Sequence, residues 1–340
     1  MFQKTHYGTL PSGDEVLQLT LSHADGITVS FITYGATMTS LMVQNTDVVL
    51  GYTSLEEYRQ DTASIGVTVG RYANRIANGM FELNGIPYDV GRNEVARNGH
   101  LHGGAVGFQV KNWLLDEHDD KSFTLSLVSP DGDMGYPGTL TLKLRVALDE
   151  PSALSLTYTA VSEKDTVVNF TNHAYFNLGG YDSGDVLDTE LQINADSILS
   201  VNERLIPTGE QLSVDGTPFD FRVSKPIGRD IDNKHEQLLL GGGYDHNFIL
   251  GNTMAFRRAV TAYSPRSGIR MHCDTDQPGI QLYTANFLTS SCGKGGPMTK
   301  HQGFCLETQH FPDSPNHPEF PTTVLRANEI FSSRTVYSFE

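Results

Sequence analysis

The chain has 340 residues, with 24 lysines and arginines against 40 aspartates and glutamates, and its formal net charge is −16. Such acidity opposes association with a nucleic-acid backbone or an anionic membrane surface, so we expect neither as a partner. A chain of this length can bury a large core and fits a prior of roughly one to three domains.

Cysteine usage and the first residues indicate a reducing compartment. Cys273, Cys292 and Cys305 show no CxxC spacing, and an odd count is a poor basis for a disulfide framework. The start, MFQKTHYGTLPSGDEV, lacks the apolar core of a signal peptide. No stretch approaches the ~20 apolar residues that cross a bilayer. We therefore expect a soluble, cytoplasmic protein.

Short apolar runs between 33 glycines and 15 prolines predict strands rather than long helices. Short helices are expected only in SLEEYRQD and RDIDNKHEQL. In chain order, the predicted strands are 26–34, 37–43, 123–128, 139–148, 154–161, 166–177, 189–193, 269–275, 280–286 and 303–309. Stacked sheets bury so many two-faced strands best, and no linker divides the chain. We expect an all-β fold in a single domain, residues 1–340.

The first motif with candidate chemistry is VGRYANRIANG, which contains Arg71, Asn74 and Arg75. The rigid guanidinium fork of arginine could clamp sugar hydroxyls or a carboxylate. It could equally tie two loops together through backbone carbonyl oxygens, and the sequence leaves both roles open. No GxGxxG follows a strand and opens a helix, so a nicotinamide cofactor is not expected.

The next motif, ARNGHLHGG, places His100 and His102 on the same side of an extended segment. Such a pair can bind a metal. However, no carboxylate follows within several residues, HExxH does not occur and the cysteines are scattered, so no catalytic metal is expected. A neutral histidine that donates to a hydroxyl group is the favoured interpretation.

The stretch TVVNFTNHAYFNL, residues 166–178, has polar groups at alternate positions. In an extended strand one face would carry Asn169, Thr171, His173, Tyr175 and Asn177. A lone histidine on such a face is most often a satisfied surface or core residue. Together with aromatic and amide side chains, however, it also fits the wall of a carbohydrate site.

Two later motifs each contain a candidate carboxylate. In GGGYDHNFIL, Asp245 either braces a turn or accepts hydrogen bonds from sugar hydroxyls. In GFCLETQHF, Glu307 shares a strand face with Cys305 and Gln309. Partial desolvation there would raise its pKa toward general-base strength, although a surface glutamate on an edge strand fits this segment equally well. No GxSxG or cysteine nucleophile motif supports acyl chemistry.

In this order, the segments resemble the aldose 1-epimerase (galactose mutarotase) family over most of the chain. The resemblance is carried by GRYANRIANGMFELNG, HLHGG, DGDMGYPGTL, NFTNHAYFNLGG, INADSILSVNERLIPTGE, TPFDFR, GYDHNFIL, GIQLYTANFL and FCLETQHFPDSPN. Any one of these motifs is only modestly specific, but nine in the family's order are a strong signal.

The resemblance implies a β-supersandwich of mostly antiparallel strands with a cleft for free hexoses such as galactose and glucose. It implies interconversion of α and β anomers without a cofactor, by a monomer or homodimer. Glu307 matches the family's general base and His173 its general acid. The substrate-contacting positions match Asn74, Arg75, His102, Tyr175, Asp245 and Gln281. His100 falls in a more variable place and is left out.

The implied reaction needs a proton to leave the C1 hydroxyl while another reaches the ring oxygen. We therefore expect Glu307 to be ionised and His173 protonated at the start. Three alternatives remain: an enzyme acting on hexose 6-phosphates, a non-catalytic sugar-binding protein, and a glycoside hydrolase that uses Asp245 and Glu307.

Overall fold

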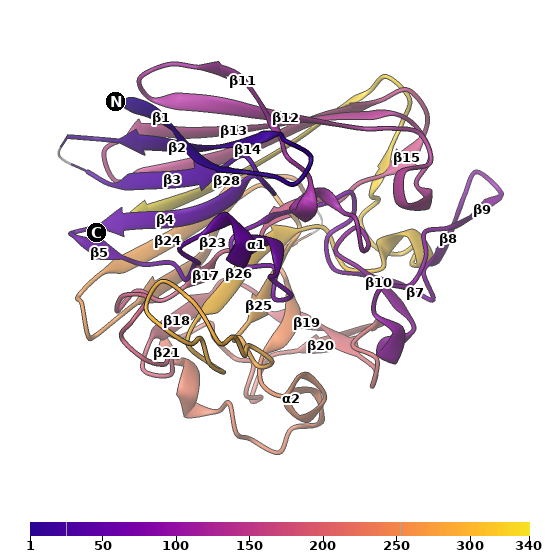
Figure 1. Cartoon of the computed structure of the whole chain (residues 1–340). Helices are drawn as coiled ribbons and strands as arrows, with labels where there is room; N and C mark the ends of the chain where they lie inside the picture. The colour runs from indigo at the N-terminus through magenta and orange to yellow at the C-terminus, as the bar shows by residue number, and fades with distance from the viewer. Residues whose placement is uncertain (25, 252) are drawn as a thin grey trace.

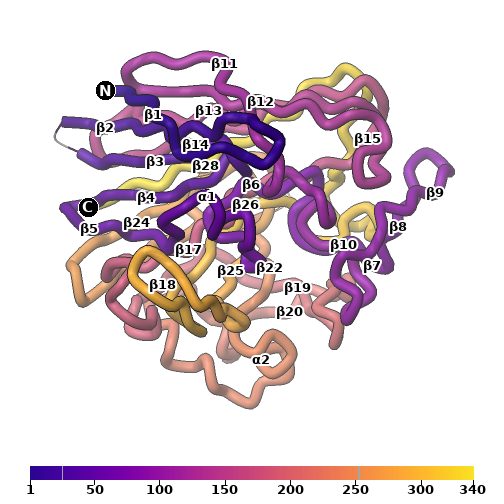
Figure 2. Tube along the Cα trace, in the orientation of Figure 1, coloured from indigo at the N-terminus to yellow at the C-terminus, as the bar shows by residue number. Residues whose placement is uncertain are grey.

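The computed structural model of the chain describes residues 1–24, 26–251 and 253–340. Antiparallel strands dominate it, as Figure 1 shows, and the Cα trace of Figure 2 places both ends of the chain on one side. The two α-helices found among these residues, α1 (Leu55–Arg59) and α2 (Glu236–Gly241), are short. They overlap the two predicted helical segments. Within the described ranges, no helix has the length and hydropathy needed to span a membrane.

Three sheets contain most of the strands in the described part of the chain. Sheet I has the order β11 (Leu114–His118), β12 (Ser122–Ser129), β13 (Leu140–Glu150), β14 (Ala153–Ser162), β28 (Ile330–Phe339), β24 (Arg270–Thr275), β23 (Arg257–Tyr263), β18 (Glu190–Ile193), β21 (Lys225–Pro226). Sheet II has the order β17 (Tyr175–Phe176), β26 (Phe304–Gln309), β25 (Gly279–Tyr283), β22 (Asp245–Ile249), β19 (Ser197–Val201), β20 (Pro207–Ser213). Sheet III has the order β1 (Phe2–Thr9), β2 (Glu15–Ser22), β3 (Thr28–Ile32), β4 (Thr37–Val43), β5 (Thr46–Asp47).

Four two-stranded pairs complete the strands of the described residues. They are β6 (Thr68–Val69) with β16 (Thr171–Asn172), β7 (Arg75–Ala77) with β10 (Gly99–Leu101), β8 (Met80–Leu83) with β9 (Ile86–Asp89), and β15 (Thr166–Val167) with β27 (Val324–Leu325). The pair of β7 and β10 carries loops that reach over sheet II, and this is where the candidate site lies.

Alternation of apolar and polar residues explains the long strands of sheet I. In β13, Leu140, Leu142 and Leu144 are fully buried, whereas Thr141 and Lys143 between them are exposed. Each fully buried leucine stabilises the fold by about 1.5–3 kcal/mol relative to an exposed one. This pattern holds only if β13 stays extended with one face in the core, so the sequence specifies both its conformation and its register.

Sheets II and III pack side by side on the same face of sheet I. Phe31 of β3 meets Phe123 of β12 with ring centroids 5.8 Å apart. Phe176 of β17 meets Tyr337 of β28 at 5.1 Å. The pairing of β12, β13, β14 and β28 places Phe123 and Tyr337 on one face of sheet I. The result is a two-layer β-sandwich, so the all-β prediction is confirmed.

Most predicted strands match observed ones within two residues at each end, but the continuous strand over 166–177 is wrong. The stretch forms three separate two-residue strands, β15, β16 and β17, which pair with β27, β6 and β26. Every residue from 166 to 178 is buried. The segment therefore threads between sheets instead of forming one half-exposed strand, and its polar residues have buried partners.

Candidate active site

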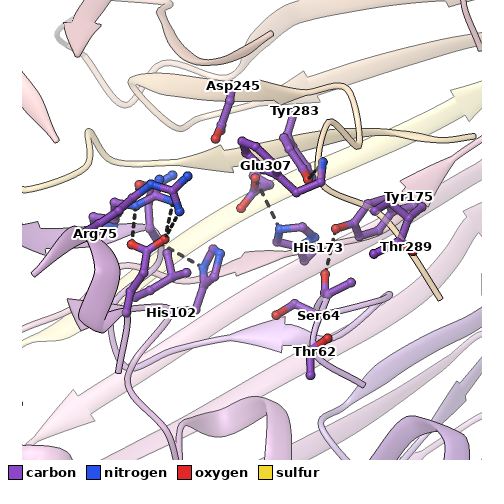
Figure 3. Close-up of a pocket in the computed structure, with 17 residues that line it drawn as sticks. Thr62, Ser64, Arg75, His102, His173, Tyr175, Asp245, Tyr283, Thr289 and Glu307 are labelled. Atoms are coloured by element: carbon purple, nitrogen blue, oxygen red, sulfur yellow. Dashed lines mark hydrogen bonds and ion pairs between the residues drawn. The ribbon is translucent and has the colours of Figure 1, made fainter. Parts of the chain in front are cut away.

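A cavity of ≈ 330 Å³ lies over the face of sheet II that points away from sheet I. This size is at the lower end of the roughly 300–1,000 Å³ that is usual for small-molecule sites. Its floor is the sheet, and its walls come from residues 62–64, 74–75, 94–102 and 287–289. Figure 3 shows the side chains that converge there from these separate segments.

Strand register brings the candidate residues of sheet II onto one face. Glu307 of β26 pairs with Gln281 of β25. In the neighbouring row, Tyr283 of β25 pairs with Asp245 of β22. Residues two apart on a strand share a face, so these side chains project the same way, whereas intervening residues such as Leu306 point into the core. One sheet face thus collects the polar groups.

Glu307 sits at the centre of the floor and is only 2% exposed. Burial, followed by the nearby charge of Asp245, raises its pKa to about 8, while the charge of Arg75 opposes the shift. Its Oε1 lies 3.7 Å from His173 Nε2, as the dashed line in Figure 3 marks. Its Oε2 has no hydrogen-bond partner among the described residues. A buried carboxyl of this kind can exchange a proton near neutral pH.

His173 faces Glu307 from the segment between β16 and β17. Burial lowers its pKa to about 4, and the nearby main chain of the same residue only partly opposes this shift. Aromatic rings surround the imidazole: its centroid lies 5.2 Å from that of His102, 5.1 Å from that of Tyr175 and 6.3 Å from that of Tyr283. The ring is therefore confined between Glu307 and an aromatic wall.

The two pKa shifts correct the protonation states expected from the sequence. In the free site burial favours the neutral carboxyl of Glu307 and the neutral imidazole of His173, whereas we expected an ionised Glu307 and a protonated His173. Between about pH 4 and about pH 8 the pair holds one proton in total. The expected ion pair has the same proton count and differs only in which partner carries the proton.

His102 and Asn74 hold each other through two hydrogen bonds. The His102 N–H donates to the Asn74 carbonyl at 3.1 Å, and the Asn74 N–H donates to His102 Nδ1 at 3.3 Å. Because Nδ1 accepts, the neutral ring carries its proton on Nε2. Burial lowers the pKa of His102 well below its ordinary value. A neutral His102 can therefore donate Nε2–H to a hydroxyl group.

The same ring bears on the question of a metal. Ligand atoms of His102, His173 and Glu307 lie within 4.8 Å of one another, which makes these three residues a candidate metal site. A metal at His102 Nε2 would require the proton to move to Nδ1, where the N–H of Asn74 already points. This arrangement counts against a metal, and its expected absence stays a prediction.

Arg75 enters the pocket at the start of β7 with its charge already paired. Its Nε lies 2.7 Å and its Nη2 3.0 Å from the two carboxylate oxygens of Glu94. Arg97 Nη1 donates to the same carboxylate at 2.6 Å. Burial alone would raise the pKa of Glu94, but the bonds to Arg75 and Arg97 outweigh it, and the net shift is downward. Glu94 therefore stays ionised and fixes both guanidinium groups.

Asp245 and Gln281 form a further buried pair. Gln281 Nε2 donates to Asp245 Oδ1 at 2.7 Å. Burial raises the pKa of Asp245, while the charge of Arg75 opposes the shift. Asp245 lines the cavity, but Gln281 does not reach its surface and acts on it through Asp245. The remaining oxygen of Asp245 is free to accept from a ligand hydroxyl.

Tyr175 lines the cavity with its ring while its hydroxyl is used elsewhere. The hydroxyl donates to the Ala63 carbonyl at 2.7 Å and so ties the 62–64 loop to the floor. Asp61 accepts from the N–H groups of Ala63 and Ile65, which shapes the same loop. Tyr175 therefore offers an apolar ring face, and it also holds one wall of the site in place.

Four polar residues singled out in the sequence have structural partners outside the cavity. Arg71 donates to the carbonyls of Pro137 and Gly138, and His100 bonds the Tyr136 hydroxyl at 2.8 Å. Asn169 Nδ2 donates to the carbonyls of Ala73 and His310, and Asn177 Nδ2 to those of Gly184 and Gln302. Arg71, Asn169 and Asn177 thus satisfy buried backbone carbonyls, and His100 satisfies a buried hydroxyl.

The sequence interpretation missed several residues of the walls, among them Glu94, Arg97, Tyr283 and Phe287. Tyr283 follows Gln281 by two positions on one strand, so the alternation could have identified it. Glu94 and Arg97 come from a loop whose local sequence resembles any charged surface segment. Phe287 is 52% exposed at the rim, where Arg97 lies 5.4 Å from its ring centroid.

Comparison with known proteins places this geometry in a family. A family model described as aldose 1-epimerase matches residues 17–338. The chain is 39% identical to the galactose mutarotase of Rattus norvegicus over 99% of this chain and 98% of that protein. It is 37% identical to the aldose 1-epimerase of Escherichia coli over 97% and 96% of the two chains.

A solved structure agrees with these sequence comparisons. The crystal structure of galactose 1-epimerase from Lactobacillus acidophilus is 30% identical and covers 100% of this chain and 98% of its own, with a TM-score of 0.89. The predicted galactose mutarotase-like sandwich is thereby confirmed. From sequence and fold together, the chain belongs to the aldose 1-epimerase family.

Proposed function

We propose that the protein is a mutarotase that interconverts the α and β anomers of a free aldose, with galactose as the first substrate to test. Relatives named galactose mutarotase and aldose 1-epimerase match nearly the whole chain. The observation that carries the proposal is the buried pair of Glu307 and His173, whose facing atoms lie 3.7 Å apart on the cavity floor. The pair holds one proton, so it can give that proton to the ring oxygen while it takes another from the C1 hydroxyl.

In ring opening, the carboxylate of Glu307 takes the proton of the C1 hydroxyl while the imidazolium of His173 gives its Nε2 proton to the ring oxygen. The bond between C1 and the ring oxygen breaks, and C1 becomes an aldehyde carbon. Rotation about C1–C2 presents the other face of the aldehyde. Ring closure then reverses both transfers and leaves the opposite anomer, so no proton is gained or lost over the cycle.

The electrostatics of the cavity suit this sequence. Ring opening converts a charged pair, carboxylate and imidazolium, into a neutral carboxyl and a neutral imidazole. Burial favours these neutral forms of Glu307 and His173. The hydroxyl groups of a bound sugar can in turn donate to the Glu307 carboxylate and support the charged state that begins the cycle. The pair is thus poised between its two states.

The remaining polar groups fit a neutral, hydroxyl-rich ligand. His102 presents Nε2–H as a donor, and Asp245 presents a carboxyl oxygen as an acceptor. The guanidinium groups of Arg75 and Arg97 retain N–H donors beyond those that bind Glu94. Fixed donors and acceptors of this kind orient a sugar and bring C1 against the acid and base.

The same groups argue against the alternatives. A hexose 6-phosphate needs free cationic groups, but both guanidinium groups of the cavity bind Glu94, and Asp245 and Glu307 add two more carboxyl groups. A non-catalytic sugar-binding protein has no use for a buried acid and base facing each other. For a glycoside hydrolase, Asp245 would be the second carboxyl group, but Gln281 already donates to one of its oxygens, and the other is left to accept from ligand hydroxyls.

The test is the optical rotation of freshly dissolved α-D-galactose, with and without the purified protein, in buffer containing a chelator. We expect a much faster approach to the equilibrium rotation. Failure to accelerate galactose or glucose would refute the proposal. Parallel assays with glucose 6-phosphate and with release of aryl alcohol from an aryl galactoside test the phosphosugar and hydrolase alternatives.

A further inference from the structure

The two ring nitrogens of His173 meet two residues of the same strand. His173 Nε2 lies 3.7 Å from Glu307 Oε1, and His173 Nδ1 lies 3.6 Å from Cys305 Sγ. Cys305 and Glu307 are two positions apart on β26 and therefore share a face. Strand β26 thus sets the surroundings of both nitrogens. The mechanism uses Glu307 but gives no role to the thiol.

The position of Cys305 is rigid and apolar. The residue is fully buried, and its backbone pairs directly with that of Tyr175, two residues beyond His173. It packs in a cluster that includes Leu50 and Tyr175. Burial raises the pKa of the thiol well above its ordinary value, so the group stays a neutral thiol. Such a sulfur can act as a weak donor or a weak acceptor.

The protonation of the two ring nitrogens of His173 during the reaction decides whether the sulfur must donate or accept. When His173 gives its Nε2 proton to the ring oxygen, the neutral ring that remains must hold its proton on Nδ1. Ring closure returns a proton to the same Nε2. A thiol that donated to Nδ1 would instead keep the neutral ring protonated on Nε2 and block that return. An accepting sulfur keeps the productive tautomer throughout.

The other titratable groups around the ring do not contact Nδ1. Glu307 faces Nε2, while His102, Tyr175 and Tyr283 approach the ring with their own rings at 5.1 Å or more between centroids. Among the side chains of the described ranges, Cys305 is the one recorded within hydrogen-bonding distance of Nδ1.

We propose that Cys305 is a positioning residue whose sulfur accepts the Nδ1–H of His173 and keeps Nε2 as the nitrogen that exchanges protons with the sugar. A neutral sulfur fixes the tautomer without stabilising the imidazolium as a carboxylate would. His173 therefore remains a stronger acid, which suits the weakly basic ring oxygen of a pyranose. This role rests on the proposed mutarotase function.

The test reads the tautomer directly, in the free protein without sugar. Long-range ¹H–¹⁵N spectra of histidine-labelled protein distinguish a protonated from an unprotonated ring nitrogen, and His173→Asn identifies the signal. We expect the Nδ1–H tautomer in the wild-type protein at neutral pH. We expect a mixture of tautomers in Cys305→Ala, and recovery of Nδ1–H in Cys305→Ser, whose hydroxyl oxygen can also accept.

Cys273→Ala is the matched control, because Cys273 is equally buried but lies on β24 of sheet I. It should leave the His173 tautomer unchanged. In the anomer-exchange assay, Cys305→Ala should lower kcat by about tenfold, the lower end of what removal of a histidine-orienting group costs. KM should stay within about twofold, since the thiol lies behind the ring and does not meet the sugar, and Cys305→Ser should regain part of the lost kcat.

An Nε2–H tautomer in the wild-type protein would overturn the proposal, even if no Cys305 variant folds. So would a Cys305→Ala spectrum that matches the wild type. Because the tautomer is read without sugar, absence of mutarotase activity would refute the proposed function and leave the spectral result intact. The two proposals therefore fail by separate observations.

Discussion

Two glutamates that line the cavity lie in opposite environments, Glu94 in the wall and Glu307 on the floor. Glu94 binds Arg75 through both oxygens at 2.7 and 3.0 Å and also Arg97 at 2.6 Å, and its pKa is lowered. Among the described residues, the nearest basic group to Glu307 is His173 at 3.7 Å, and burial raises the pKa of Glu307 to about 8. Glu94 is therefore a fixed anion, whereas Glu307 is a group that exchanges protons.

The two glutamates differ in their direct contacts with arginine. Arg75 influences Glu307, but its direct bonds go to Glu94, so it only partly offsets the effect of burial. A direct contact between Arg75 and Glu307 would hold Glu307 ionised and make it a poorer base. The pairing of Arg75 with Glu94 therefore preserves proton exchange at Glu307. Each prediction below disturbs one side of this contrast.

The largest effect should come from removing the partner of Glu307. His173→Asn should lower kcat by about 10²- to 10⁴-fold, because no general acid would then protonate the ring oxygen. The measurement is polarimetry with α-D-galactose. His310→Asn is the control, since His310 is also buried with a pKa lowered to about 4 but lies outside the cavity. Near-wild-type turnover in His173→Asn would exclude it as the acid.

Breaking the pair of Arg75 and Glu94 should raise KM more than it lowers kcat. Arg75→Lys cannot reproduce the two bonds to Glu94, so both groups should lose their fixed geometry. We expect KM to rise by about 10-fold, as the loss of one or two hydrogen bonds to charged groups implies. Arg71→Lys is the control, because Arg71 donates to backbone carbonyls away from the cavity. It should lower Tm and leave KM within about twofold. Equal KM effects would remove the distinction between the two arginines.

The pH profile sharpens the contrast. We expect kcat/KM to fall above the Glu307 pKa of about 8, where the pair loses its single proton. The negative charge of Asp245 raises the Glu307 pKa, so Asp245→Asn should move this alkaline limb to lower pH, besides weakening binding. Asp274→Asn on sheet I should leave the limb in place. A limb that moves upward in Asp245→Asn would contradict the assignment.

The smallest effect concerns stability. Between its ordinary pKa and about 8, Glu307 is protonated in the folded protein and ionised in the unfolded chain, so stability falls as pH rises through this range. His173 opposes this trend below its ordinary pKa, because there the unfolded chain binds the extra proton. Of these two groups, only Glu307 contributes above pH 6.5.

Glu307→Gln should therefore unfold at higher temperature than the wild type at pH 8.5, with a smaller difference at pH 5.5. Thermal denaturation at the two pH values measures this, and Glu210→Gln, on the exposed surface, serves as the control. If the difference in Tm between the wild type and Glu307→Gln is the same at both pH values, Glu307 is not strongly desolvated.

Strands with one face in the core could be predicted from the sequence. The alternation in β13 and β14 gives each a unique register, and the predicted and observed ends agree closely. The stretch 166–178 could not be predicted in this way. All of its residues are buried, and polar side chains such as Asn169 and Asn177 bond carbonyls of distant loops. Period-2 reasoning assumes a solvent face that this segment does not have.

The site divides along the same line. Residues in distinctive motifs, such as Glu307, His173 and His102, could be proposed from the sequence, and the structure brings them together around one cavity. Glu94 could not, because its significance arises only from contact with Arg75, 19 positions away. The protonation states of Glu307 and His173 could not be predicted either, because their desolvation depends on every segment that covers the sheet.

The most direct test of the central claim is anomer exchange at equilibrium, measured by NMR saturation transfer between the α and β anomeric protons of galactose at pH 6.5. The account predicts fast exchange with the wild-type protein. With folded Glu307→Gln at the same concentration, it predicts exchange reduced by orders of magnitude. Exchange at the wild-type rate in Glu307→Gln would contradict the claim that this buried carboxyl moves the proton.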